Sequence, residues 1–327
     1  MKVFVSGGAG YIGGVVVSQL VAAGHEAVVY DNLRNGHPDS VPSAARLVVG
    51  DVGDRAKLCE IFAEFQPEAV MHFAASIEAG ESMRDPAKFF RNNTANALTL
   101  LETILSHKVR CLVFSSTAAL YGDPVSIPIR ESDRLLPINA YGESKLLVER
   151  MLGWFHRIHG LSYASLRYFN AAGATENLGE RHDPESHLIP IILQVASGLR
   201  EYVSIFGDDY DTLDGTCVRD YVHVSDLASA HLLALHALHS RPEPTQLIYN
   251  LGNGHGFSVR EVIECARRVT GRAIPAVVEA RRTGDPAILV AGSEKIRAEL
   301  GWTPQYPGLE QIVRSAWEYI QRGKQGD

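Results

Sequence analysis

Apolar residues in the first half of the chain follow two alternating spacings, one typical of strands and one typical of helices. Short β-branched runs predict strands at Lys2–Ser6, Ala27–Tyr30, Ala45–Val49, Ala69–Phe73, Cys111–Ser115 and Tyr163–Leu166. Between them, an apolar period near ~3.6 residues predicts helices at Tyr11–Ala23, Arg55–Phe65, Pro86–Ser106 and Tyr141–Ile158. This alternation favours an α/β fold with a doubly wound parallel sheet of the Rossmann type.

The pattern loosens from about residue 171, where Gly, Asp and Pro cluster at 173–184 and 207–216. We expect a smaller mixed α/β C-terminal domain that contributes most of a substrate pocket. Apolar segments near 221–238 and 247–253 are expected to return to the first domain. The predicted division is therefore 1–170 plus about 220–252, and about 171–219 plus 253–327, with a polar tail at 321–327.

The bulk properties exclude several classes of partner. A net charge of −7 argues against nucleic acid and anionic membranes, which need a surplus of Lys and Arg facing them. No apolar run approaches the roughly 18–20 residues of a membrane span, and no signal peptide is visible. The cysteines form no CxxC pair, which predicts free thiols in a reducing, cytoplasmic compartment: Cys59, Cys111, Cys217 and Cys265.

The thirteen histidines show no grouping typical of metal ligands. His231, His236 and His239 share a predicted helix and are interpreted as part of a solvated face. We therefore expect no metal site.

The segment FVSGGAGYIGG joins the first predicted strand to the first helix. Gly8, Gly10 and Gly13 fit G-x-G-x-x-G, and Gly7, Gly10 and Gly13 fit the related G-x-x-G-x-x-G spacing. Glycines allow a tight turn whose backbone N–H groups approach a pyrophosphate at the positive end of a helix. The strand–helix context is the one that this motif requires.

Two carboxylates end the next predicted strands. Asp31 ends the second strand, where it would accept hydrogen bonds from an adenosine ribose and repel a 2′-phosphate. This favours NAD over NADP. Asp51 ends the third strand, where it can meet the adenine amino group or simply cap the following helix.

A possible catalytic group lies in NAYGESK and in FSSTAALYG. Tyr141 precedes Lys145 by one helical turn, so both side chains lie on one face. A free phenol, with a pKa near ~10, is a poor base at neutral pH. An adjacent ammonium and a positively charged nicotinamide would both pull that pKa down. The hydroxyl of Thr117 can donate to a sugar oxygen and relay its proton to Tyr141.

Long motifs extend from the glycine loop to about residue 318, among them GGAGYIGG, HFAA, LRYFNAAGA, IFGDDYDTLDGTCVRDYVHVSDLA and RRTGDPA. On these motifs the chain resembles the extended short-chain dehydrogenases/reductases and, within them, the 4-epimerases of UDP-glucose and UDP-galactose. The resemblance implies an NAD-binding first domain and a UDP-sugar-binding second domain. It also implies a homodimer whose helices at Pro86–Ser106 and Tyr141–Ile158 pair across a two-fold axis.

The resemblance assigns residues to each part of the site. It implies catalytic roles for Tyr141, Lys145 and Thr117, with Tyr141 as the base while hydride passes to and from NAD through a transient 4-keto sugar. It implies an NAD site formed by Gly7, Gly10, Tyr11, Ile12, Gly13, Asp31, Asn32, Asp51, Val52, Phe73, Ala74, Ala75, Asn92, Thr117, Tyr141, Lys145 and Phe169. It implies a UDP-sugar site formed by Thr117, Tyr141, Asn170, His187, Leu188, Ser204, Phe206, Arg219, Arg282 and Asp285.

Three alternatives are weighed against this interpretation. A sugar-nucleotide 4,6-dehydratase would carry an acidic pair where this chain has Ala118 and Ala119, and methyl groups cannot transfer protons. A non-catalytic NAD-binding protein would be expected to lose Tyr141 or Lys145.

The third alternative is a 4-epimerase of UDP-N-acetylglucosamine or UDP-glucuronate, and it stays open. Leu289, at a position that sets pocket width in this family, is of intermediate size. Ile77 and Glu78 depart from the family pattern near the expected cofactor site. The carboxylate of Glu78 would disfavour a uronate if it faced the sugar, but it can also face solvent.

Overall fold

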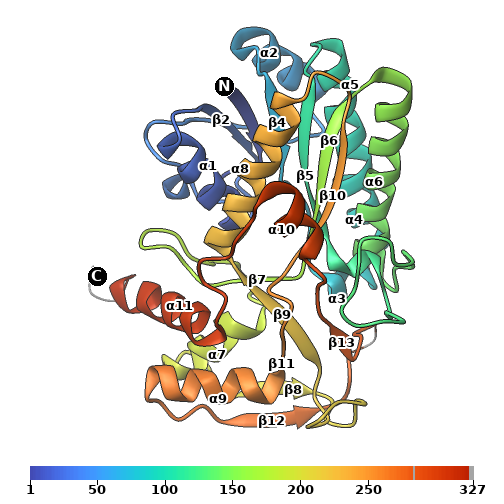
Figure 1. The fold of residues 1–327 in the computed structure, drawn as a ribbon. Coiled ribbons are helices and arrows are strands. Elements are labelled where there is room, and N and C mark those ends of the chain that lie inside the picture. Colours follow the sequence, from blue (N-terminus) through green and yellow to red (C-terminus); the bar gives the residue numbers. More distant parts are fainter. Residues whose placement is uncertain (283, 324–327) are drawn as a thin grey trace.

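The computed structural model describes residues 1–282 and 284–323, and its centre is a seven-stranded parallel sheet (Figure 1). The strands lie in the order β10-β6-β5-β4-β1-β2-β3. Their bounds are β1 (Lys2–Ser6), β2 (Glu26–Asp31), β3 (Arg46–Val49), β4 (Ala69–His72), β5 (Cys111–Thr117), β6 (Ser162–Tyr168) and β10 (Gln246–Leu251). The predicted Rossmann-type sheet is confirmed. The strand order reverses between β1 and β4, which is where α/β proteins bind ligands beyond the carboxyl ends of the strands.

Helices cover both faces of this sheet because successive strand side chains point to opposite sides (Figure 1). Val3 and Val5 pack into the core on one face, under α1 (Tyr11–Ala22) and α8 (Val224–Ser240). Phe4, between them, packs into the core on the other face. That face is covered by α2 (Arg55–Phe65), α5 (Asn96–Ser106) and α6 (Ala140–His159).

The helix predicted over Pro86–Ser106 changes type along its length. It comprises α4 (Pro86–Phe89), a π-helical segment η2 (Phe90–Ala95) and α5. The π turn lets Asn93 point inward, where its Oδ1 accepts from the Ser76 backbone N at 2.8 Å. Its Nδ2 donates to Ser144 Oγ at 3.0 Å. Through these hydrogen bonds, the segment connects α6 to the loop after β4. The spacing of apolar residues in the sequence does not reveal such contacts.

Beyond the sheet, a second set of elements packs around its own core (Figure 1). The elements are β7 (Asn170–Ala172), α7 (Leu188–Ala196), β8 (Val203–Phe206), β9 (Val218–His223), β11 (Gly256–Ser258), α9 (Val259–Thr270), β12 (Ala276–Glu279), β13 (Ile288–Leu289) and α11 (Leu309–Gly323). β9 pairs with β7, β11 and β13, while β8 pairs with β12. Ile296 of α10 (Glu294–Leu300) and Trp302 instead join the core under α1 and α8. The division into two domains stays a prediction.

Short helical turns complete the described fold: η1 (Pro38–Ser40), α3 (Ala79–Ser82) and η3 (Ala118–Leu120). The predicted polar tail is helical as far as Gly323, and 324–327 lie outside the described residues. The four cysteines are free thiols, three of them buried and Cys59 half-buried. Among the described helices, none is both long and apolar enough to span a membrane.

The interpretation of His231 as part of a solvated face was wrong. Its side chain is fully buried, and its Nδ1 hydrogen-bonds to the Leu227 carbonyl at 2.8 Å. Its Nε2 hydrogen-bonds to the hydroxyl of Tyr168. The sheet lies against this side of α8, so polar residues there are buried with hydrogen-bond partners.

Candidate active site

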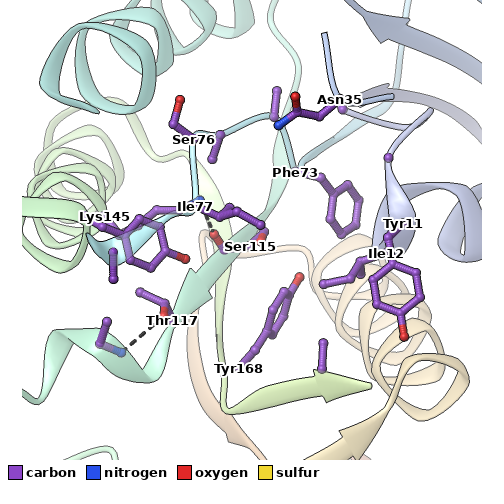
Figure 2. Close-up of a pocket in the computed structure, with 18 of the residues that line it drawn as sticks. Tyr11, Ile12, Asn35, Phe73, Ser76, Ile77, Ser115, Thr117, Lys145 and Tyr168 are labelled. Carbon is purple, nitrogen blue, oxygen red and sulfur yellow. Dashed lines mark hydrogen bonds between the residues drawn. The ribbon is translucent and has the colours of Figure 1, made fainter. Parts of the chain in front are cut away.

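A cavity of about 420 Å³ lies at the carboxyl ends of the central strands. Figure 2 shows Tyr11 and Ile12 of α1 on one side of it, and Thr117 and Lys145 on the other. Every residue predicted to bind the cofactor lines this cavity. The parallel sheet thus brings together side chains from the first 170 residues that are far apart in sequence.

The glycine loop has the tight geometry that its motif predicts. Gly7 has a φ of +76°, and a Cβ there would lie 2.4 Å from the backbone N of Ala74. A Cβ at Gly13 would lie 2.2 Å from the Gly7 carbonyl oxygen. Gly10 is the N-cap of α1, and no side chain caps that helix end. The first N–H groups of α1 therefore face the cavity wall, as the pyrophosphate of a dinucleotide requires.

The two carboxylates are held in different ways. Asp31 is buried, and its Oδ2 and Oδ1 accept from the backbone N of Ala9 at 3.0 Å and of Leu33 at 2.9 Å. An ionised carboxylate can accept further hydrogen bonds, so Asp31 keeps capacity for ribose hydroxyls. Asp51 accepts from the side chains of Asn32 and Asn96. Asp54, not Asp51, is the N-cap of α2, which excludes the capping role considered for Asp51.

Tyr141 and Lys145 lie in the first turns of α6, which begins after the N-cap Asn139. The Nζ of Lys145 donates to the Ser115 carbonyl oxygen at 2.9 Å (Figure 2). Thr117 ends β5, and its hydroxyl lies close enough to Tyr141 to lower the pKa of that phenol. The structure therefore brings the three predicted catalytic side chains to one end of the cavity.

Burial dominates the protonation of this group. Burial raises the pKa of Tyr141; the hydroxyl of Thr117 lowers it in part, and the carboxylate of Glu78 raises it further. Burial also lowers the pKa of Lys145 to about 7. The expected lowering of the Tyr141 pKa by the Lys145 ammonium is therefore not present in the chain alone. The phenol needs additional positive charge before it can act as a base near neutral pH.

The two residues that depart from the family pattern lie close to this group. Ile77 lines the cavity beside Ser76 (Figure 2). Glu78 is half-buried, and its Oε2 accepts from the backbone N of Ile77 at 3.1 Å. Its charge reaches Tyr141, as the pKa of that phenol shows.

The predicted substrate residues divide into two groups. The cavity is lined by Asn170, His187, Arg219 and Asp285, together with Leu289. The guanidinium of Arg219 is buried and hydrogen-bonds to the Asp285 carboxylate, so these two side chains pair with each other.

The other predicted substrate residues lie outside the cavity lining: Leu188, Ser204, Phe206 and Arg282. The guanidinium of Arg282 lies 3.8 Å from the centroid of the Phe206 ring. Ser204 donates to Glu279 Oε1 at 2.7 Å on β12. The structure therefore does not bring these side chains to the same place as Tyr141.

Sequence reasoning missed several residues that line the cavity, among them Arg34, Ser115, Tyr168, Glu180 and His182. Tyr168 and Ser115 lie at the ends of neighbouring strands, where the strand-end rule could have identified them. The prediction that the histidines show no grouping typical of metal ligands was also wrong. His182 and His187 lie with Glu180 and Glu185, in an E-x-H-x-x-E-x-H spacing that was visible in the sequence.

Comparisons with known proteins identify the family of the chain and support its fold. The sequence model of the NAD dependent epimerase/dehydratase family matches residues 3–252. The UDP-glucose 4-epimerase of Halalkalibacterium halodurans is 52% identical over 321 residues, covering 98% of this chain and 95% of that protein. A crystal structure of UDP-glucose 4-epimerase from Brucella ovis in complex with NAD is 44% identical, with a TM-score of 0.93 and 98% coverage of both chains. The enzyme from Bifidobacterium longum, in complex with NAD+ and UDP, is 35% identical, with a TM-score of 0.94 and 100% coverage of both chains.

Proposed function

The chain belongs to the NAD dependent epimerase/dehydratase family, and from that premise we propose that it interconverts UDP-glucose and UDP-galactose. The observation that carries the proposal is the meeting of Thr117, Tyr141 and Lys145 with the glycine loop around one cavity. Each motif alone is common in proteins. Together they provide a dinucleotide site and a proton-transfer group within one pocket.

The same cavity argues against dehydration of the sugar. Ala118 and Ala119 line it where a 4,6-dehydratase would need an acidic pair. Their methyl groups cannot donate or accept a proton. A binding protein without catalysis is disfavoured because Tyr141 and Lys145 are both present and both line the cavity.

The glycine loop, Asp31 and the buried strand ends fit an NAD molecule. At Gly7 and Gly13 the neighbouring backbone lies so close that only a residue without a Cβ fits, as the dinucleotide-binding motif requires. When bound, NAD supplies a positively charged ring and exchanges a hydride with carbon 4 of the sugar. Asp31 would hold the adenosine ribose, and the first turn of α1 would hold the pyrophosphate.

The chain's own residues would handle the proton of the 4-hydroxyl. Tyr141 would take it as phenolate and return it after the sugar has presented its other face. Thr117, whose hydroxyl already lowers the pKa of Tyr141, would orient the hydroxyl and relay the proton. Lys145, when protonated, would stabilise the phenolate by its charge. The buried surroundings would exclude water from the keto sugar.

The nucleotide part of the substrate would be held by residues from the second set of elements. Asn170, His187, Arg219 and Asp285 line the cavity and suit a diphosphate and a ribose. Leu289 also lines it and would limit the width available to the hexose. Leu188, Ser204, Phe206 and Arg282 lie outside the cavity lining, and their contact with the nucleotide stays a prediction.

We also propose that the protein is a homodimer located in the cytoplasm. Trp154 and Ile158 on α6 are 56% and 65% exposed, and Leu98 on α5 is 39% exposed. These apolar side chains would be covered if α5 and α6 pair with the same helices of a second copy. The four free thiols support a reducing compartment.

The test is epimerisation by the purified protein with no NAD added, followed by chromatography of the products. UDP-galactose, UDP-N-acetylgalactosamine and UDP-glucuronate are compared as substrates. Conversion of UDP-galactose to UDP-glucose is expected, because a cofactor restored in every turnover need not leave. Turnover of only the acetylated sugar or the uronate would overturn the substrate assignment. No inversion of any substrate, even with NAD supplied, would overturn the chemistry.

A further inference from the structure

Four metal-ligating side chains converge on the segment that connects β7 to α7. Glu180, His182, Glu185 and His187, which we call the Glu180–His187 cluster, each offer one ligand atom. These atoms all lie within 4.8 Å of one another. The catalytic group proposed above includes none of these four side chains, and only His187 is among the residues proposed to hold the substrate.

The contacts within the cluster are short and centred on Glu180. Its Oε1 lies 2.9 Å from His182 Nδ1 and 2.8 Å from His187 Nδ1. The Oε1 of Glu185 lies 2.8 Å from the same His187 nitrogen. Two imidazole nitrogens and two carboxylate oxygens thus gather within 4.8 Å of one another.

The charge of the cluster is not balanced by a permanent cation. The side chains of Glu180 and Glu185 are only 7% and 3% exposed. Within the described residues, their ion pairs are formed with His182 and His187 and not with Lys or Arg. Buried carboxylates require compensation by positive charge. Either protons on the two imidazoles supply this positive charge, or one divalent cation supplies it while both imidazoles stay neutral.

We propose that the Glu180–His187 cluster binds one divalent transition-metal ion of the Zn²⁺ type, with one ligand atom from each of the four side chains. Two imidazole nitrogens with two carboxylate oxygens are a donor set that suits such an ion better than Mg²⁺ or Ca²⁺, which prefer oxygen ligands alone. At Zn–ligand distances of about 2.0–2.2 Å, neighbouring ligands of a tetrahedral ion lie roughly 3.3–3.5 Å apart. The three short contacts of 2.8–2.9 Å would widen by about half an ångström, and the more distant ligand atoms, all within 4.8 Å of one another, would move closer together.

Backbone groups already orient one of the ligands. The Oε1 of Glu185 accepts from the backbone N of Ser186 at 2.7 Å and of His187 at 2.8 Å. Hydrogen bonds of this kind fix the ligand carboxylate and are a regular feature of metal sites. Glu180, His182 and His187 also line the cavity, so a bound ion would fix the segment that forms this wall.

The experiment uses the full chain with its own cofactor, dialysed against a chelator and then titrated with ZnCl₂ in a calorimeter. We expect one Zn²⁺ per chain and a rise in Tm, since an ion that binds the folded state stabilises it. His182→Ala and Glu180→Gln are expected to weaken zinc binding at least about tenfold, because each removes one of four ligands. Anomalous diffraction at the zinc edge, from crystals of the unaltered protein, locates the ion without relying on any variant.

The matched control is His236→Ala. His236 and His25 form an exposed pair with their Nε2 atoms 3.1 Å apart, which is the competing place for adventitious zinc. Retained affinity in this control, with an anomalous peak between Glu180 and His187, supports the proposal. Loss of the bound zinc in His236→Ala, a peak elsewhere, or no heat of binding would overturn it and leave the cluster as an ion-pair network. None of these outcomes depends on the epimerase assignment.

Discussion

Replacing Tyr141 by Phe separates the proposed chemistry from the fold. The substitution removes one hydroxyl and leaves the aromatic ring, which packs edge-on against Phe89 with ring centroids 6.4 Å apart. The buried volume is nearly conserved, so no cavity is created. The polar contact by which Thr117 lowers the pKa of Tyr141 is lost.

The expected magnitudes differ widely between activity and stability. A positioned general base contributes about 10²–10⁴ in rate, which corresponds to roughly 2.7–5.4 kcal/mol at ~1.36 kcal/mol per factor of ten. Loss of the polar contact should lower the free energy of unfolding by no more than a typical hydrogen bond contributes, about 0.5–1.5 kcal/mol. Tyr141→Phe should therefore lower kcat by at least about a hundredfold while Tm and the bound cofactor change little.

The assay compares kcat for UDP-galactose, Tm and the NAD content of the denatured protein. Tyr163→Phe is the matched control, since Tyr163 is a buried tyrosine in the core beneath α6 and does not line the cavity. The control should keep normal turnover. If Tyr141→Phe kept a kcat within tenfold of the unaltered enzyme, Tyr141 would not be the base and the interpretation of the catalytic group would be refuted.

Three further predictions concern the cofactor, a buried charge and the proposed dimer. Asp31→Ala should weaken NAD binding by about tenfold or more, since a hydrogen bond to a charged group contributes roughly 1.5–3 kcal/mol, and unchanged NAD content in the purified variant would contradict this. Lys145→Met should raise the free energy of unfolding of the NAD-free protein at pH 6, where the ammonium is charged and buried. The difference in free energy of unfolding between the variant and the unaltered protein should narrow toward pH 9. In that range the folded-state lysine, whose pKa is about 7, loses its proton while the unfolded lysine keeps its own. A difference that stays constant with pH would count against the prediction. Trp154→Glu combined with Ile158→Glu should give a monomer by light scattering, whereas Leu213→Glu, at a fully exposed position, should leave the assembly unchanged.

Much of the sheet and of the cofactor site could be predicted from sequence because the responsible interactions are local. The six predicted strands and most helix bounds agree within two residues, since a strand or helix buried on a fixed face imposes its own period. The glycine loop could be recognised because Gly7 and Gly13 occupy places that no Cβ can enter. Tyr141 and Lys145 share a helix face for reasons of spacing alone.

Long-range packing decided what the sequence could not show. The π-helical turn at Phe90–Ala95 depends on hydrogen bonds between Asn93 and residues 17 and 51 positions away. The burial of His231 depends on the sheet beneath α8, and the raised pKa of Tyr141 depends on the whole wall of the cavity.

By itself, the sequence determined the Rossmann-type sheet, the glycine loop and the shared helix face of Tyr141 and Lys145, because each is encoded within one turn or one strand–helix unit. Only the tertiary structure decided that Arg219 pairs with Asp285 and that Arg282 lies over Phe206 outside the cavity. It also decided that two histidines and two glutamates meet at one point. Electrostatics and burial act between groups brought together by folding, so they are properties of the assembled structure and not of any segment.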